Sequence, residues 1–325
     1  MPLSTRLTKK LGIQHPVLSA PMALAAGGAL AAAVSNAGGL GLIGGGYGER
    51  GWLEEQFRAA GNARVGCGFI TWSLRKQPEL LELVLDRDPA AVFLSFDDPQ
   101  PFAAKVTQAD VILICQVQTR RDAERAIDCG ADILVAQGAE AGGHGDKRAT
   151  MSLVPEIADL LARLAPETLL CAAGGIADGR GLAASLMLGA DGVVVGSRFW
   201  ASQEALVHPN LHDAALQASG DDTLRTKVPD IARRLDWPER FTIRVLHNAF
   251  TTRWHGREDD LIAQAEGEAA KWRAAWSAGD SRTANTVIGE AAGLIHDVQP
   301  AGLLLETLMS EAEHLLGAAR SRYLA

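Results

Sequence analysis

Short apolar runs recur along the chain from Val17 to Val195, and more polar stretches separate them. Each run is a few residues long, rich in Val, Ile, Leu, Ala or Cys, and continuous rather than alternating between apolar and polar positions. Such continuous runs are typical of strands that are buried on both faces of a parallel sheet. The eight predicted strands are Val17–Ala20, Leu40–Ile43, Val65–Ile70, Ala91–Phe96, Val111–Val117, Ile133–Ala136, Leu169–Ala172 and Gly192–Val195.

The stretches between these runs have the spacing of amphipathic helices, and several end at a glycine such as Gly130 or Gly189. Eight strand–helix units favour a closed (β/α)8 TIM barrel over an open, doubly wound sheet. The open sheet is the alternative if one or two of the short runs are not strands. The clearest predicted helices are Glu79–Asp86, Arg120–Cys129, Val154–Leu164 and Gly179–Leu188.

The pattern changes after Ser197. From Ala205 to Ala284 the strand-like runs cease, while tryptophan, charge and helix formers become more frequent, which predicts a mainly helical cap inserted after the eighth strand. The final segment, Gly289–Leu324, carries a helical leucine pattern and is expected to return to the barrel as a closing helix. We therefore predict a barrel made of residues 1–204 plus 285–325, and a cap of residues 205–284.

Composition narrows the classes of partner. The net charge of −8, from 31 basic and 39 acidic residues, argues against nucleic acid or an anionic membrane as the main partner. The apolar stretch from Val17 to Gly46 is broken by Pro21 and by several glycines, so it suits a strand, turn and helix better than a membrane span. With no secretory signal pattern at the N-terminus, we expect a soluble cytoplasmic protein.

The four cysteines are widely spaced and form no CxxC pair, and the histidines show no metal-ligand spacing within a helix. A disulfide framework is therefore not expected, and we predict no metal site.

Candidate chemistry lies where the predicted strands end, because the active sites of such barrels are built at the carboxyl ends of the strands. Gly174-Gly175 follows the seventh strand, and Gly196-Ser197 follows the eighth. Glycines allow backbone amides to approach a phosphate closely, and barrels often bind a phosphate between these two loops. The alternative is that these glycines only form tight turns. The two pairs together favour a phosphorylated ligand.

His144 lies in the loop after the sixth strand, with a glycine on each side. A histidine in this setting suits a general acid or base, although it can also serve as a turn residue that caps the loop. Met22, after Pro21, is placed to contact a flat ring or simply to pack at the rim. Gln116 is placed to donate a hydrogen bond to a ring carbonyl or to a neighbour in the barrel mouth.

With these residues in place, the chain resembles the nitronate monooxygenase family, formerly called 2-nitropropane dioxygenases. The combination of Glu140-Ala-Gly-Gly-His144 with Ala172-Ala-Gly-Gly-Ile176 is far more specific than a lone glycine motif. The matching segments are Ala20–Met22, Gly130–Gly138, Glu140–Gly145, Ala172–Arg180, Leu188–Gly192, Val195–Phe199 and, more weakly, Gly289–Ile295.

The resemblance implies an FMN-dependent oxidoreductase that uses O2 to convert alkyl nitronates, such as propionate 3-nitronate, into a carbonyl compound and nitrite. It implies that His144 is the catalytic base or the residue that orients the nitronate. It also implies FMN-binding roles for residues of the rim: Met22, Gln116, Gly142 and Gly143 near the flavin, and Gly174, Gly175, Gly196 and Ser197 on its phosphate.

Two positions depart from the family pattern. Many members carry an asparagine just after the third strand, where this chain has Gly66–Trp72, and Ser197 stands where threonine is more common. NAD(P)H:quinone reductases share the scaffold and are the leading alternative. Flavin-dependent enoyl-ACP reductases are a further one, although they usually have glutamate at the position of Gln137. A non-enzymatic flavin module would leave His144 without a task.

The expected partners are a small-molecule substrate and O2, and the apolar surface of the cap allows a homodimer. The sequence does not identify the physiological substrate.

Overall fold

The computed structural model describes residues 3–323, and it confirms the predicted (β/α)8 barrel. Eight parallel strands pair in the order β1-β9-β8-β6-β5-β4-β3-β2. A parallel bridge between Leu18 and Leu40 joins the two ends of the sheet and closes the barrel. The strands are β1 (Val17–Ser19), β2 (Leu42–Gly46), β3 (Gly66–Ile70), β4 (Ala91–Ser95), β5 (Ile112–Val117), β6 (Ile133–Gln137), β8 (Leu169–Ala173) and β9 (Gly192–Val195).

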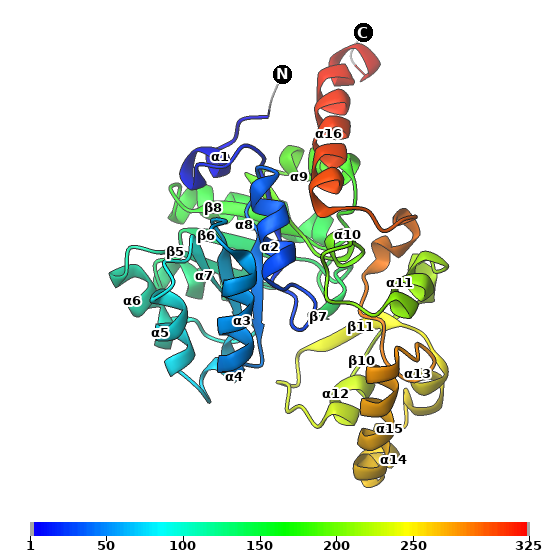
Figure 1. Cartoon of the computed structure of the whole chain (residues 1–325). Coiled ribbons are helices and arrows are strands. Elements are labelled where there is room, and N and C mark those ends of the chain that lie inside the picture. The colour runs from blue at the N-terminus through cyan, green and yellow to red at the C-terminus, as the bar shows by residue number, and fades with distance from the viewer. Residues whose placement is uncertain (1–2, 324–325) are drawn as a thin grey trace.

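Helices surround the barrel (Figure 1). The last of them, α16 (Ala301–Tyr323), packs against α9 and α2, so the predicted closing helix is confirmed as far as Tyr323. Leu324, its predicted end, lies outside the described residues. The other surrounding helices are α2 (Gly28–Asn36), α3 (Arg50–Ala60), α4 (Thr71–Leu74), α5 (Glu79–Leu85), α6 (Gln100–Gln108), α7 (Arg120–Asp128), α8 (Thr150–Leu164) and α9 (Gly179–Met187).

Two apolar layers hold the barrel together. Along β4, Phe93 packs inside the barrel, whereas Val92 and Leu94 pack outward against the helices. This alternation follows from the period of two of a strand, and both faces are buried because helices cover the outside. The short helix α1 (Arg6–Leu11) places Leu7 and Leu11 against the inner layer, and Leu7 meets the start of β9.

Strand β2 extends to Gly46, three residues beyond its predicted end at Ile43, because its glycines accommodate the loop that follows β1. A Cβ atom at Gly44 would lie 2.3 Å from the carbonyl oxygen of Met22, and one at Gly68 of β3 would lie 2.4 Å from the Pro21 ring. These glycines are thus part of the sheet, and their lack of a side chain brings Pro21 and Met22 into the barrel mouth.

The cap is mainly helical, but the expectation that strands are absent from it is wrong at two places. Strands β10 (Thr223–Thr226) and β11 (Thr242–Leu246) form an antiparallel sheet with β7 (Gly143–Gly145), in the order β10-β11-β7. Both cap strands mix polar with apolar residues, so they lack the continuous apolar runs that identify the barrel strands. The sheet ties the cap to the loop that carries His144.

The remaining elements of this region have a small core of their own, in which Val228, Ala232, Trp254 and Trp272 are buried together. The cap lies beside the barrel in Figure 1, coloured yellow-green to orange. Its boundaries at residues 205 and 284 stay a prediction. The elements after β9 are α10 (Ser197–Trp200), α11 (Pro209–Leu216), η1 (Gly220–Asp222), α12 (Val228–Arg233), α13 (Ala249–Trp254), α14 (Glu258–Ala263), α15 (Ala265–Ala278) and η2 (Glu290–Leu294).

Within residues 3–323, no helix is both long enough and apolar enough to cross a membrane.

Candidate active site

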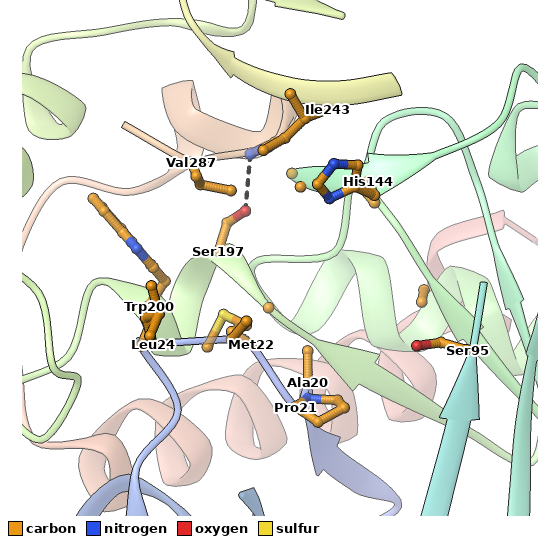
Figure 2. A pocket seen from close by; sticks show the side chains of 18 of the residues that line it. Ala20, Pro21, Met22, Leu24, Ser95, His144, Ser197, Trp200, Ile243 and Val287 are labelled. Carbon is orange, nitrogen blue, oxygen red and sulfur yellow. Dashed lines mark hydrogen bonds between the residues drawn. The ribbon is translucent and has the colours of Figure 1, made fainter. Parts of the chain in front are cut away.

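A cavity of about 260 Å³ opens at the carboxyl ends of the barrel strands, between the barrel and the cap. Figure 2 shows His144 and Ser197 on its walls, with Met22 and Pro21 on the side of the barrel mouth. Every residue that the sequence predicted for the site lines this one cavity: Met22, Gln116, Gly142, Gly143, His144, Gly174, Gly175, Gly196 and Ser197.

The two glycine loops present free backbone amides to the cavity. None of the N–H groups of Gly174, Gly175, Gly196 and Ser197 donates a hydrogen bond to an acceptor in residues 3–323. Gly174 and Gly175 have φ values of +103° and +74°, a conformation that glycine adopts far more readily than other residues. Because backbone amides without an acceptor are suited to bind an anion, this wall of the cavity fits a phosphate group.

The Ser197 hydroxyl is held toward the same wall. Its Oγ accepts a hydrogen bond of 2.9 Å from the backbone N–H of Gly289, drawn as a dashed line in Figure 2. The hydroxyl proton therefore stays available for an acceptor in the cavity. The segment around Gly289, which the sequence matched only weakly to the family, is thus part of the site.

His144 is 8% exposed and forms a buried pair with Asp230, a residue of the cap helix α12. Its Nε2 atom lies 3.0 Å from Asp230 Oδ1 and 2.9 Å from Oδ2. A carboxylate can only accept, so Nε2 carries the proton and donates it. Burial lowers the pKa of His144, and the hydrogen bond and charge of Asp230 offset only part of that effect. His144 is therefore neutral at neutral pH, with a lone pair on Nδ1.

Aromatic side chains enclose the imidazole. The Trp237 ring stacks on it with 3.4 Å between ring centroids and an angle of 8° between the planes. Phe96 meets it edge-on at 6.1 Å. Trp237 and Phe96 both line the cavity, so their rings shield the imidazole of His144 from water.

Three glutamine side chains form a network in the barrel mouth. Gln137 Oε1 accepts hydrogen bonds from Gln116 Nε2 at 3.1 Å and from Gln118 Nε2 at 3.0 Å. With its oxygen occupied in this way, Gln137 has its amide N–H groups left to donate. Gln116 and Gln137 line the cavity, whereas Gln118 is a supporting residue that does not.

A cation lies on the cap side of the cavity. The guanidinium of Arg233, one turn after Asp230 on α12, lies over the Tyr47 ring at 5.0 Å and over the Trp272 ring at 5.6 Å. No carboxylate among residues 3–323 lies within 4.0 Å of it. An arginine held between rings without a carboxylate partner is suited to bind an anion that enters the cavity.

The cap residues of the site were missed by sequence reasoning. Asp230, Arg233 and Trp237 lie in a stretch without any motif, and only their charge and aromatic character marks them. Their partners are distant in the sequence, so the contact with His144 exists only in the folded chain. No group of three or more His, Cys, Asp or Glu side chains in the described part of the chain is arranged to hold a metal ion.

The fold and the cavity define a class of protein: a (β/α)8-barrel enzyme with backbone amides exposed at the rim of its cavity and a buried histidine beside them. The chain belongs to the nitronate monooxygenase family, whose sequence pattern it matches over residues 4–64 and 71–311. The gap in the match falls on β3 and the residue before it, the region where the sequence departs from the family pattern.

Individual relatives agree with this assignment. The chain is 34% identical to the nitronate monooxygenase of Neurospora crassa, over 91% of this chain and 89% of that protein. It is also 34% identical to the nitronate monooxygenase npaC of Metarhizium robertsii, over 92% and 91%. Among solved structures, FabK from Thermotoga maritima superposes with a TM-score of 0.86 at 30% identity, covering 98% of this chain and 99% of that one. The protein is an oxidoreductase of the nitronate monooxygenase type, a family of flavoenzymes that oxidise nitronates.

Proposed function

We propose that the protein uses FMN and O2 to oxidise alkyl nitronates, such as propionate 3-nitronate, to a carbonyl compound and nitrite. The observation that carries this proposal is the pairing, in one cavity, of a neutral histidine with a free ring nitrogen and four free backbone amides. FMN would supply the electron-accepting ring, and the protein contributes binding, orientation and exclusion of water.

The residues of the cavity fit FMN. The amides of Gly174, Gly175, Gly196 and Ser197, with the Ser197 hydroxyl, would hold its phosphate. The side chains and loop that we assign to its ring are Met22, Gln116, Gly142 and Gly143, which line the adjacent walls.

We propose that His144 is the base that converts a nitroalkane into its nitronate by removing a proton. The carbon beside the nitro group would lose that proton to the lone pair on Nδ1, which leaves an anionic nitronate and an imidazolium held by Asp230. A histidine whose pKa is lowered by burial is in the neutral form that this step needs. For a substrate that arrives already as the nitronate, the same ring would orient it.

The position of Arg233 favours a nitronate substrate that carries a second negative charge. Its guanidinium has no carboxylate partner within 4.0 Å in the described residues, and it lines the cavity with His144. Propionate 3-nitronate carries a carboxylate that could pair with it, whereas a simple alkyl nitronate carries none.

The test is anaerobic mixing of the purified yellow protein with propionate 3-nitronate or with NADH, followed by O2. We expect bleaching by the nitronate, nitrite formation and nitronate-dependent O2 uptake. Bleaching by NADH alone, without nitronate-dependent O2 uptake, would exclude the monooxygenase. Chromatography of the released flavin distinguishes FMN from FAD, and a protein that stays colourless after FMN is added would refute the cofactor.

A reductase is the second candidate, because the FabK structure covers nearly the whole chain. Gln137 argues against the enoyl-ACP reductases, since they usually have a glutamate at this position. Here the side chain is an amide whose oxygen is fully engaged by two other glutamines. The NADH arm of the experiment decides between the two activities. The homodimer and the cytoplasmic location stay predictions, of which size-exclusion chromatography tests the first.

A further inference from the structure

The buried pair of His144 and Asp230 joins two parts of the chain that are 86 residues apart. Asp230 is only 3% exposed, and His144 Nε2 is the single cationic or histidine nitrogen within 4.0 Å of its carboxylate in residues 3–323. Burying a carboxylate is unfavourable unless it is paired, and a neutral imidazole is a weaker partner than a guanidinium. A buried carboxylate whose partner is a neutral histidine therefore indicates a functional site.

The sheet of β10, β11 and β7 positions both residues of the pair, one directly and the other through a connecting helix. His144 lies on β7, where it stands opposite Ile243 of β11. Asp230 lies in the first turn of α12, the helix that connects β10 to β11. Val228 and Ala232 anchor α12 in the core of the cap. The cap thereby fixes the carboxylate relative to the imidazole, and neither side chain depends on a flexible loop for its position.

We propose that Asp230 is a positioning residue of the active site, which holds the His144 ring with Nε2 protonated and leaves the Nδ1 lone pair for the substrate. The proposal rests on the proposed role of His144 as a base. When Nδ1 accepts a proton, the imidazole becomes a cation, and the carboxylate at 2.9 Å stabilises it. The cap thus contributes Asp230 to the catalytic base, because this carboxylate orients and stabilises His144.

Other charged groups also act on the imidazole. Arg233, on α12, and Arg225, on β10, lower the pKa of His144, whereas the hydrogen bond and charge of Asp230 raise it. Burial lowers it more than any of these. Among residues 3–323, Asp230 carries the only charge that raises this pKa. Replacing it by asparagine therefore makes His144 a weaker base, and its tautomer is no longer dictated by a carboxylate.

The first experiment measures the tautomer directly, by 15N NMR of the flavin-loaded enzyme with labelled histidine, the His144 signal being assigned with His144→Gln. Wild-type His144 should be protonated on Nε2, and Asp230→Asn should mix the tautomers and lower the pKa. Glu268→Gln is the matched control, because Glu268 is an equally buried carboxylate of the cap at 3% exposure that does not line the cavity. It should leave the His144 signal unchanged.

The second experiment compares nitroethane with preformed ethyl nitronate as substrates. Since only nitroethane needs a base, Asp230→Asn should lower kcat/KM for nitroethane by on the order of 10- to 100-fold, less than the roughly 10²- to 10⁴-fold that the base itself contributes, because His144 stays in place. Its effect on the nitronate should be several-fold smaller. A merely structural role would lower both rates together.

A wild-type His144 protonated on Nδ1 overturns the proposal even if Asp230→Asn fails to fold. So does a folded Asp230→Asn enzyme with wild-type tautomer, pKa and substrate ratio. An enzyme that shows the predicted NMR behaviour but oxidises neither substrate refutes the proposed function, while it supports the positioning of His144 by Asp230.

Discussion

Gly196→Ala should weaken FMN binding without lowering the stability of the apoprotein, because the added methyl group fits the empty protein but occupies space beside the proposed phosphate site. Gly196 has a φ of −103°, outside the left-handed region that favours glycine over other residues. An added Cβ would lie 3.5 Å from Ala20 Cβ and 3.9 Å from Met22 Sδ, ordinary contact distances. The empty protein therefore has room for the methyl group. Its two neighbours both line the cavity, so the methyl occupies space beside the amide that we assign to the FMN phosphate.

The expected loss is that of overpacking a formed site, about 1–3 kcal/mol. At about 1.4 kcal/mol per tenfold change, FMN should bind about 5- to 150-fold more weakly. Titration of the apoprotein with FMN, followed by flavin fluorescence, measures this change, while the Tm of the apoprotein should not fall.

Gly302→Ala is the matched control. Its Cβ would lie 3.5 Å from Ala37, the same clearance, but Gly302 lies on α16 and does not line the cavity. It should bind FMN like the wild type. A Gly196→Ala protein with wild-type FMN affinity would refute the assignment of this loop to the phosphate. An apoprotein that unfolds at a much lower temperature would refute the conclusion that the empty protein has room for the methyl group.

Three further predictions concern single groups. Ser197→Ala leaves the Gly289 N–H without an acceptor and should cost about 1–3 kcal/mol of stability as well as FMN affinity, whereas Ser197→Thr should restore both; calorimetry and FMN titration check this. Arg233→Met should raise KM for propionate 3-nitronate by about 10- to 150-fold, as expected for the loss of about 1.5–3 kcal/mol from a charged hydrogen bond. Equal effects on propionate 3-nitronate and ethyl nitronate would contradict a carboxylate partner. Burial lowers the pKa values of His144 and His212 below the ordinary 6.5, so the unfolded chain binds protons more readily. Their contribution to stability is complete above pH 6.5 and is lost as the pH falls through their folded pKa values; a Tm that does not fall between about pH 7.5 and about pH 5.5 would contradict it.

The barrel was predictable because its strands follow a local rule. A strand buried on both faces, such as β4, is apolar along most of its length, and that property is visible in a single segment. The nine predicted cavity residues lie at the ends of barrel strands or in the loops after them, which meet at the same rim of the barrel, and the family resemblance added Gly142 and Gly143 to this set. Gly174, Gly196 and His144 can therefore be grouped from their places in the sequence alone.

The two strands of the cap do not follow that rule. In β10 the sequence Thr-Leu-Arg-Thr has no continuous apolar run, and it forms a strand because β11 pairs with it. The glycines that follow the predicted second strand, Gly44 to Gly46, belong to β2 because the loop with Met22 packs against them. In both cases the conformation is decided by a neighbour from elsewhere in the chain.

By itself, the sequence determined the barrel, the order of its loops and the residues that those loops bring to one rim, because these depend on local hydrophobic periodicity. Only the tertiary structure decided what faces the rim from the cap. Asp230 and Trp237 contact His144, and Arg233 lines the same cavity, because β11 pairs with β7 and the cap helix α12 lies beside it. Contacts between segments so far apart in the sequence leave no periodic pattern, since each is set by the packing of the whole chain.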